Sequence, residues 1–188
     1  MLVKTRITTA SELVTFSKAL NSGAILDGVT VFLNDNIDFS DDVFSGQFEP
    51  IGNSLNNSFQ GTFYGQGSII SNLRIISSRA YANEATIRSA VLDSSCSALS
   101  ECTGLNDTYV GGIIGHCTRC IIENSVNMAS ANFTGRTSDI LCLGGIAGEL
   151  YSDSKNVITK NCANYGSVTH SGTVNKNIHV CGVIGRSR

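Results

Sequence analysis

Charged residues are scarce in this chain of 188 residues, and their scarcity excludes one class of partner. Only 15% of the residues are charged, against roughly 25% in typical soluble domains. Thirteen basic residues stand against 15 acidic ones, which gives a net charge of -2, and the basic residues form no cluster. A nucleic-acid binder needs such a cluster to neutralise phosphates. We therefore expect no nucleic-acid partner.

Long apolar runs are also missing. No window approaches the ~18 consecutive apolar residues of a membrane-spanning helix, and Met1–Lys4 is not followed by the apolar core of a signal peptide. We therefore expect no membrane insertion. Hydrophobic residues still make up 41% of the chain, which is enough to bury one sizeable core. Residues 1–188 are predicted to form a single domain.

The chain does contain an internal repeat. Val110–Gly115 (VGGIIG) is echoed by Leu143–Gly148 (LGGIAG) and Val180–Gly185 (VCGVIG), at offsets of 33 and 37 residues. Between these copies, Ile121–Asn127 and Ile158–Asn164 share an Asn-x-x-Asn pattern. Weaker copies occur earlier, at Ile69–Leu73 and Ile87–Val91. Periods of this length indicate solenoids, propellers or repeat arrays.

The residue types of the repeat favour a parallel β-helix, also called a β-solenoid. Each unit is rich in Gly, Ile, Val and Asn, and the chain has one proline, so intrinsic propensity disfavours helical repeats. Asn tolerates the left-handed backbone conformation of sharp corners, and stacked Asn side chains can form hydrogen-bonded ladders. The glycines of Gly-Gly-Ile-x-Gly are expected to serve tight bends.

One short helix precedes the strands. Thr9 and Glu12 have the spacing of a capping box, and Leu13, Phe16 and Leu20 follow at helical spacing. Asn21–Gly23 supplies the stop. We predict a cap helix within residues 8–23.

These motifs resemble the GLUG-type repeats of surface proteins and of the β-helical regions of bacterial immunoglobulin A metalloproteases. Besides the three Gly-Gly-Ile-x-Gly copies, the matching segments are Phe48–Gly52, Phe59–Gly67 and Ile70–Leu73. The resemblance implies a right-handed parallel β-helix whose N-terminal helix covers the open end, usually within a longer extracellular adhesin or stalk. It therefore implies an extracellular or cell-surface location. The zinc motif of the protease is absent from the sequence.

Residues 77–109 depart from this pattern because they lack a clean Gly-Gly-Ile-x-Gly copy. We predict an irregular coil or an insertion there, followed by regular repeats over residues 110–188.

The seven cysteines form no obvious framework, because a disulfide framework normally uses even numbers. Cys117 and Cys120 form a Cys-x-x-Cys pair that could supply half a zinc site, a redox pair, or a local disulfide or thiol pair. A second zinc-binding pair would have to come from Cys96 and Cys102, which do not share that spacing. We favour the local pair and expect no metal and no cofactor.

Three further cysteines lie at or beside coil motifs, and we expect them to fill the core as small hydrophobes: Cys142, Cys162 and Cys181. The sequence does not decide the oxidation state of Cys96, Cys102, Cys117 and Cys120. It also leaves open whether the sequons at Asn56, Asn106 and Asn132 carry glycans.

Three groups of residues suggest chemistry, and each has a simpler structural interpretation. The acidic group Asp35, Asp38, Asp41 and Asp42 could act on polysaccharides or bind calcium, but turn formation is favoured. The histidines His116, His170 and His179 are expected on the surface or in loops. The aromatic group Phe44, Phe48, Phe59, Phe63 and Tyr64 could stack on sugars, but packing under the helix end is favoured.

No catalytic, cofactor-binding or metal-binding residue is assigned from the sequence. We predict a non-catalytic structural or adhesive module, not an enzyme, that binds glycan or protein through its lateral face. One alternative is a self-assembling subunit, a homo-oligomer or filament that stacks through its C-terminal coil. Its basis is that Ile184–Arg188 shows no terminal helix or polar cap, and an uncapped solenoid end leaves strand edges open for another subunit. The other is a polysaccharide-active β-helix enzyme with a groove of Asp plus Arg or Lys.

Overall fold

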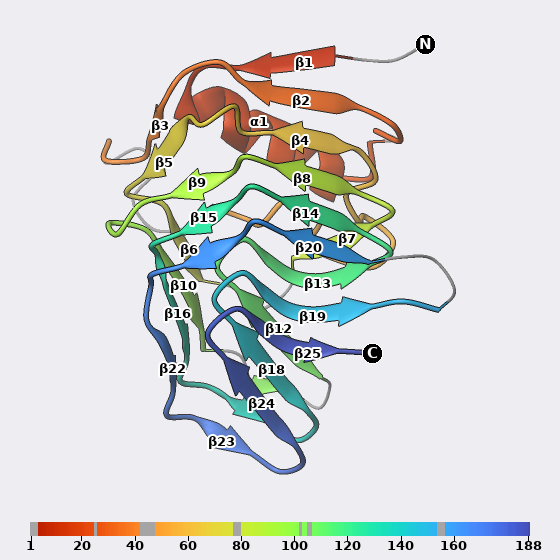
Figure 1. Cartoon of the computed structure of the whole chain (residues 1–188), viewed down its shortest axis with the longest axis vertical. Helices are drawn as coiled ribbons and strands as arrows, with labels where there is room; N and C mark the ends of the chain where they lie inside the picture. Colours follow the sequence, from red (N-terminus) through yellow and green to blue (C-terminus); the bar gives the residue numbers. More distant parts are fainter. Residues whose placement is uncertain are drawn as a thin grey trace.

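The computed structural model describes residues 4–24, 26–41, 48–76, 80–101, 103–104, 107–153 and 157–188. These residues form a parallel β-solenoid of about four turns with one helix near the N-terminus (Figure 1). The predicted all-β solenoid with a short cap helix is confirmed. No helix in the described ranges is long and apolar enough to cross a membrane.

Six parallel sheets, which we name A to F, make up the walls. Sheet A contains β1 (Lys4–Ile7), β2 (Thr30–Leu33), β4 (Thr62–Tyr64), β8 (Thr86–Arg88), β14 (Ile121–Glu123) and β20 (Ile158–Lys160). Sheet B contains β3 (Ile37–Asp38), β5 (Ile69–Ser71), β9 (Val91–Leu92), β15 (Val126–Asn127) and β21 (Ala163–Asn164). Sheet C contains β7 (Tyr81–Asn83), β13 (Ile114–Thr118), β19 (Ala147–Tyr151) and β25 (Ile184–Ser187).

The other three sheets, D, E and F, form a second part of the cross-section, which we name the arm. Sheet D contains β6 (Arg74–Ile76), β10 (Ser97–Ser100), β16 (Ser130–Phe133) and β22 (Val168–His170). Sheet E contains β11 (Thr103–Gly104), β17 (Arg136–Thr137) and β23 (Thr173–Val174). Sheet F contains β12 (Thr108–Gly111), β18 (Leu141–Gly144) and β24 (Ile178–Cys181). One full coil therefore runs through A, B, D, E, F and C in that order.

Strand alternation divides the interior into two apolar cores. The main core takes inward side chains from sheets A, B and C, such as Val31, Ile122 and Leu150. The arm has a smaller core made of Ala98, Val110, Ala131, Phe133, Leu141 and Leu143. Because successive strand residues point to opposite faces, the residues between the inward ones lie on the outside or between sheets.

Helix α1 (Ala10–Asn21) covers the N-terminal end of the main core. Its apolar residues Leu13, Phe16 and Leu20 are buried in that core. The predicted capping box is present, since the Thr9 hydroxyl accepts from the backbone N–H of Glu12 and the Glu12 carboxylate accepts from the backbone N–H of Thr9. The sequence therefore placed the helix and its start correctly.

Asparagines hold the corners of the coils, as predicted. Asn124 and Asn161 adopt left-handed backbone conformations with φ of 52°. The Asn161 side chain donates to Asn124 Oδ1 across 3.1 Å. A second ladder joins buried Asn127 to Asn164, whose Oδ1 accepts from Asn127 Nδ2 at 2.8 Å. Both elements of the Asn-x-x-Asn pattern thus bind one coil to the next.

The prediction of an irregular coil or insertion over residues 77–109 is wrong for the part that the structure describes. Strands β7 to β12 follow one another there, and β8, β10 and β12 pair in parallel register with β14, β16 and β18. Glu84 and Ser89 adopt the left-handed conformation at the corners, each with φ of 52°. Their counterparts in the next coil are Arg119 and Asn124, so the second corner is kept although Ser89 replaces the asparagine. Residues 77–79, 102 and 105–106 lie outside the described residues.

The Gly-Gly-Ile-x-Gly motifs lie where sheet F turns into sheet C. The bend is as predicted, but its physical requirement is close approach rather than positive φ, which these glycines do not adopt. A Cβ on Gly145 would collide with the carbonyl oxygen of Gly182 and with the side chain of Asn164. A Cβ on Gly148 would lie 2.6 Å from the Gly115 carbonyl oxygen. The glycine motif and the asparagine ladder are therefore parts of one packing unit.

Candidate functional site

The outer face of sheet A carries an ordered column of large side chains. In-register pairing from β1 to β14 aligns them along the solenoid axis, and we name this set the sheet A column: Arg6, Phe32, Tyr64, Arg88 and Glu123. Phe32 and Tyr64 stack with ring centres 5.3 Å apart and planes 10° apart. The Arg88 guanidinium lies 5.8 Å from the Tyr64 ring centre, and its Nε is 3.0 Å from Glu123 Oε2. These contacts fix the side chains in one arrangement before any ligand arrives.

A polar depression adjoins this column at the N-terminal end of the same face. We name it the N-terminal depression, and it is lined by Lys4, Arg6, Phe32, Asn34 and Gln66. Gln66 Nε2 donates to the Leu33 carbonyl at 2.7 Å and to Asn34 Oδ1 at 3.2 Å. A column of threonine hydroxyls runs beside it, at Thr30, Thr62 and Thr86. The face offers cations, amides, hydroxyls and aromatic edges to one ligand.

A second polar group is buried between sheets C and F, and we name it the Glu149 cluster: His116, Glu149, Arg186 and Arg188. Glu149 is completely buried. Its Oε2 lies 3.3 Å from His116 Nε2, and its Oε1 lies 3.0 Å from Arg188 Nε and 3.6 Å from Arg186 Nη1. The three basic groups come from β13 and from β25 with the residue that follows it, so the cluster ties two coils to the one between them.

Charge balance in the cluster keeps Glu149 ionised. Burial raises the pKa of this carboxyl, but the hydrogen bond from His116 and the charges of Arg188, His116 and Arg186 outweigh it and leave the pKa below its ordinary value. Burial, together with the Glu149 charge, raises the pKa of the neighbouring Cys142 thiol to about 12. The same two causes raise the pKa of Tyr109, whose ring lies 4.8 Å from that of His116. Cys142 and Tyr109 therefore stay protonated, and the cluster suits an ion pair that stabilises the fold.

The Cys-x-x-Cys pair is a local disulfide. Cys117 and Cys120 are bonded, with Cα atoms 6.0 Å apart, and both are buried. Within the described residues, no group of three or more His, Cys, Asp or Glu side chains could hold a metal ion. Cys96 is a buried free thiol whose pKa burial raises to about 11, and Cys102 lies outside the described residues.

The three cysteines expected in the core have different environments. Cys142 is buried, but it lies between sheets C and F beside the Glu149 cluster. Cys162 is partly buried against the main core. The prediction is wrong for Cys181, which is exposed on β24 in register with Gly144.

Of the acidic residues near the N-terminus, Asp38 acts in a local turn, as favoured. Asp38 accepts hydrogen bonds from Asn72 Nδ2 at 2.7 Å and from the backbone N–H and hydroxyl of Ser40 at 2.9 Å. These bonds, led by the one from Asn72, lower the pKa of Asp38. Asp35 and Asp41 are exposed, and Asp42 lies outside the described residues.

The three histidines lie on strands, and the prediction that each is a surface or loop residue fails where the side chain is also largely buried. His116 on β13 is the clearest case, since its side chain is 11% exposed and contacts Glu149. His170 on β22 stacks on Phe133, with ring centres 5.9 Å apart. His179 is on β24.

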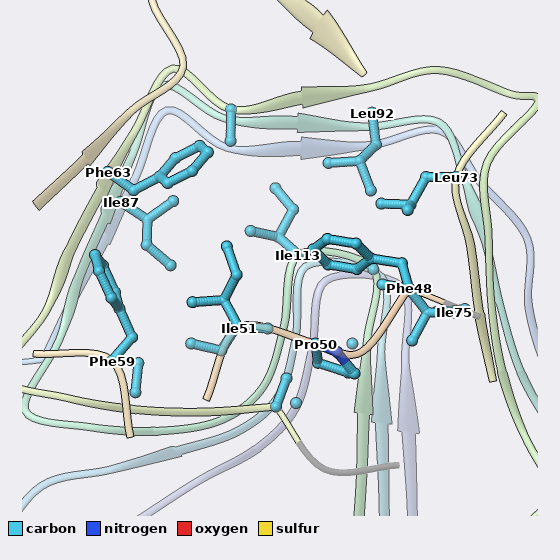
Figure 2. A pocket seen from close by; sticks show the side chains of 18 of the residues that line it. Phe48, Pro50, Ile51, Phe59, Phe63, Leu73, Ile75, Ile87, Leu92 and Ile113 are labelled. Atoms are coloured by element: carbon cyan, nitrogen blue, oxygen red, sulfur yellow. The ribbon is translucent and has the colours of Figure 1, made fainter. Parts of the chain in front are cut away.

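Most of the aromatic group packs inside, under the helix, as favoured. Phe59 contacts Phe16 of α1 edge to face, with ring centres 6.2 Å apart. Phe48 and Phe63 point into an apolar cavity of about 130 Å³ within the first coils (Figure 2). None of the described residues that line this cavity is charged. Tyr64 is the exception, because it points outward into the sheet A column, and Phe44 lies outside the described residues.

Figure 2 shows how the segment with Phe48, Pro50 and Ile51 crosses the interior between the walls. Ile87 and Leu92 point toward it from sheets A and B. The segment therefore fills part of the interior beneath the cap helix.

Two of the sequons fall on described residues. Asn56 is exposed on a turn. Asn132 is half-buried on β16, where it donates to Ser130 Oγ at 3.2 Å and accepts from the Thr169 hydroxyl. Asn106 lies outside the described residues. Asn56 is therefore the more accessible of the two described sites.

Sequence reasoning missed both polar groups. Phe32 and Arg88 each sit between inward residues, but their alignment into one column requires the register between coils. Glu149 is a single acid in an apolar run at Leu143–Leu150, which was a detectable signal of a buried charge. Its partners Arg186 and Arg188 lie almost 40 residues away, about one coil later.

Comparison with known proteins supports the fold. No protein-family model matches the sequence, and no curated protein matches it. The chain is similar in structure to a crystal structure named as a "putative immunoglobulin A1 protease" from Bacteroides ovatus, with a TM-score of 0.53 and 14% sequence identity. The similarity covers 97% of this chain and 61% of that one, so this chain spans about three fifths of its length. At this identity the likeness shows the β-solenoid fold alone.

Proposed function

We propose that the protein is a non-catalytic structural or adhesive module that binds glycans through the outer face of sheet A. The observation that carries the proposal is the sheet A column, in which Phe32, Tyr64 and Arg88 are locked by stacking and an ion pair next to the N-terminal depression. Side chains that are already ordered lose little conformational entropy when a ligand binds.

The geometry of the face suits an extended sugar chain. Neighbouring parallel strands are about 4.8 Å apart, which is comparable with the length of one sugar unit, so one coil can meet one unit. Threonine hydroxyls and amides supply hydrogen bonds to sugar hydroxyl groups, while Arg88 adds a donor fork. The protease activity in the name of the similar structure is not part of the proposal.

Substitution of Arg88 by alanine should weaken glycan binding at least tenfold, because it removes the donor fork and frees the Tyr64 ring. The measurement is a glycan array followed by calorimetry with the best ligand. Arg74→Ala is the matched control, since Arg74 is an exposed, outward arginine on sheet D. Equal losses for both variants, or none for Arg88→Ala, would rule out sheet A as the binding face.

Self-assembly through the C-terminal coil is a second candidate, because this coil exposes apolar side chains. Ile178 and Val180 are 47% and 44% exposed, whereas Leu141 and Leu143, their register partners one coil earlier, are fully buried. A large exposed apolar patch marks an interaction surface.

Sedimentation across a concentration series should therefore show a reversible oligomer that Ile178→Lys converts to monomer. Ile69→Lys is the control, since Ile69 is a similarly exposed isoleucine on sheet B. A strictly monomeric wild type at all concentrations would exclude this second role.

A further inference from the structure

We propose that the N-terminal depression selects glycans that carry carboxylate groups, so that uronate-containing chains are the ligand class. The inference rests on the proposed function and names the ligand of the same face. Lys4 and Arg6 would hold the carboxylates, and Asn34 and Gln66 would bind neighbouring hydroxyl groups.

The charge of the depression is uncompensated. Lys4 and Arg6 point outward from the edge strand β1 and are exposed, and neither has an ion pair among the residues that the structure describes. Other cations of the solenoid do pair across coils, as Arg88 does with Glu123 and Lys176 with Asp139. Two unpaired cations on one short strand therefore leave a local site for anions.

The remaining lining groups favour a sugar over a simple anion. Gln66 uses its amide nitrogen on Leu33 and Asn34, which fixes both side chains and leaves Gln66 Oε1 and Asn34 Nδ2 for a ligand. Phe32 adds an apolar edge that can contact the C–H groups of a sugar ring. A phosphate or sulfate ion could accept from Asn34 Nδ2, but it would use neither Gln66 Oε1 nor the apolar edge of Phe32.

The nearby acids only partly oppose this charge. Asp35 follows Asn34 directly and is exposed. Glu12 is held by hydrogen bonds from Thr8 and Thr9, and Glu123 is paired with Arg88. The outer face of sheet A therefore carries more positive than negative charge in its described strands, which attracts an anionic chain at low salt.

The test compares an oligogalacturonide with its fully methyl-esterified form, which has the same sugar backbone but carries a methyl group in place of each negative charge. Calorimetry on the full chain should show at least tenfold tighter binding of the acidic form, and this preference should decrease as salt increases. The double variant Lys4→Gln and Arg6→Gln should lose the preference, so that it binds the acidic form and the ester with the same affinity. Because both residues are exposed on an edge strand, circular dichroism should show the fold unchanged.

Three outcomes would overturn the inference. If both forms bind equally and the double variant changes neither, glycan binding stands without acidic selectivity. If neither form nor any other glycan binds, the proposed function fails as well. If an oligonucleotide or inorganic phosphate binds as tightly as the acidic sugar and is lost in the double variant, the site is a general anion site.

Discussion

Substitution of Gly145 by alanine is expected to destabilise the protein by about 3 kcal/mol, at the upper end of overpacking effects. The added methyl group would collide with the backbone carbonyl of Gly182 in the next coil and with Asn164 in the asparagine ladder. Backbone cannot move aside as a flexible side chain can, so the coil that contains Gly145 and the coil that contains Gly182 would have to separate. Denaturation with urea, followed by circular dichroism, measures the free energy of unfolding.

Gly182 provides a matched control because it occupies the same motif position one coil later. A Cβ on Gly182 would meet no atom within 4 Å, so Gly182→Ala should change stability by no more than about 0.5 kcal/mol. Equal effects at the two positions would show that close approach between coils is not what the motif requires. If the C-terminal coil is an assembly surface, Gly182→Ala should weaken the oligomer while leaving the monomer stable.

Substitution of Glu149 by glutamine is expected to lower the free energy of unfolding by about 3 kcal/mol, since removing one partner of a buried ion pair leaves the other buried without a counter-charge. Glu149 is fully buried and supplies the carboxylate that Arg186, Arg188 and His116 all contact. Glutamine has nearly the same shape but no charge, and it keeps one acceptor oxygen while its NH2 group faces donor nitrogens, so the loss reports on the charge and on one acceptor. The control is Glu123→Gln, whose partly exposed pair with Arg88 should contribute less than about 1 kcal/mol. A loss at Glu149 no larger than this would contradict the role assigned to the cluster.

The same substitution should change the response to acid. Since the folded pKa of Glu149 is lowered, its contribution is fully present above the ordinary glutamate pKa and is lost as the pH falls through the folded value. The difference in unfolding free energy between wild type and Glu149→Gln should therefore be constant near neutral pH and shrink below about pH 4.5. A difference that stays constant through the acid range would mean that Glu149 is not ionised in the folded protein.

Much of the architecture was predictable because successive coils of a solenoid repeat similar residues at similar spacing in the sequence. The copies at Val110–Gly115, Leu143–Gly148 and Val180–Gly185 mark one corner in successive coils, and Asn124 and Asn161 mark another. The coil over residues 77–109 was misread because its corners use Glu84 and Ser89. A left-handed corner needs a backbone conformation, and these residues can adopt it without resembling the repeat.

The candidate site was predictable only in part. The sequence directed attention to the lateral face and to aromatic residues, but it grouped Tyr64 with the buried Phe59 and Phe63. The alternation of inward and outward side chains explains the difference, since Tyr64 follows an inward residue on β4. The disulfide of Cys117 and Cys120 was one of several open alternatives until the corner between β13 and β14 brought the two sulfur atoms together.

The sequence by itself determined the repeated coil, the cap helix and the asparagine corners, because these depend on local spacing and on the conformations that Asn and Gly allow. Only the tertiary structure decided which side chains meet across coils. Arg88 reaches Tyr64 and Glu123, and Glu149 reaches Arg188, through register between strands that lie 24 to 39 residues apart. Register depends on the exact length of every corner and strand in a coil, and those lengths vary from copy to copy.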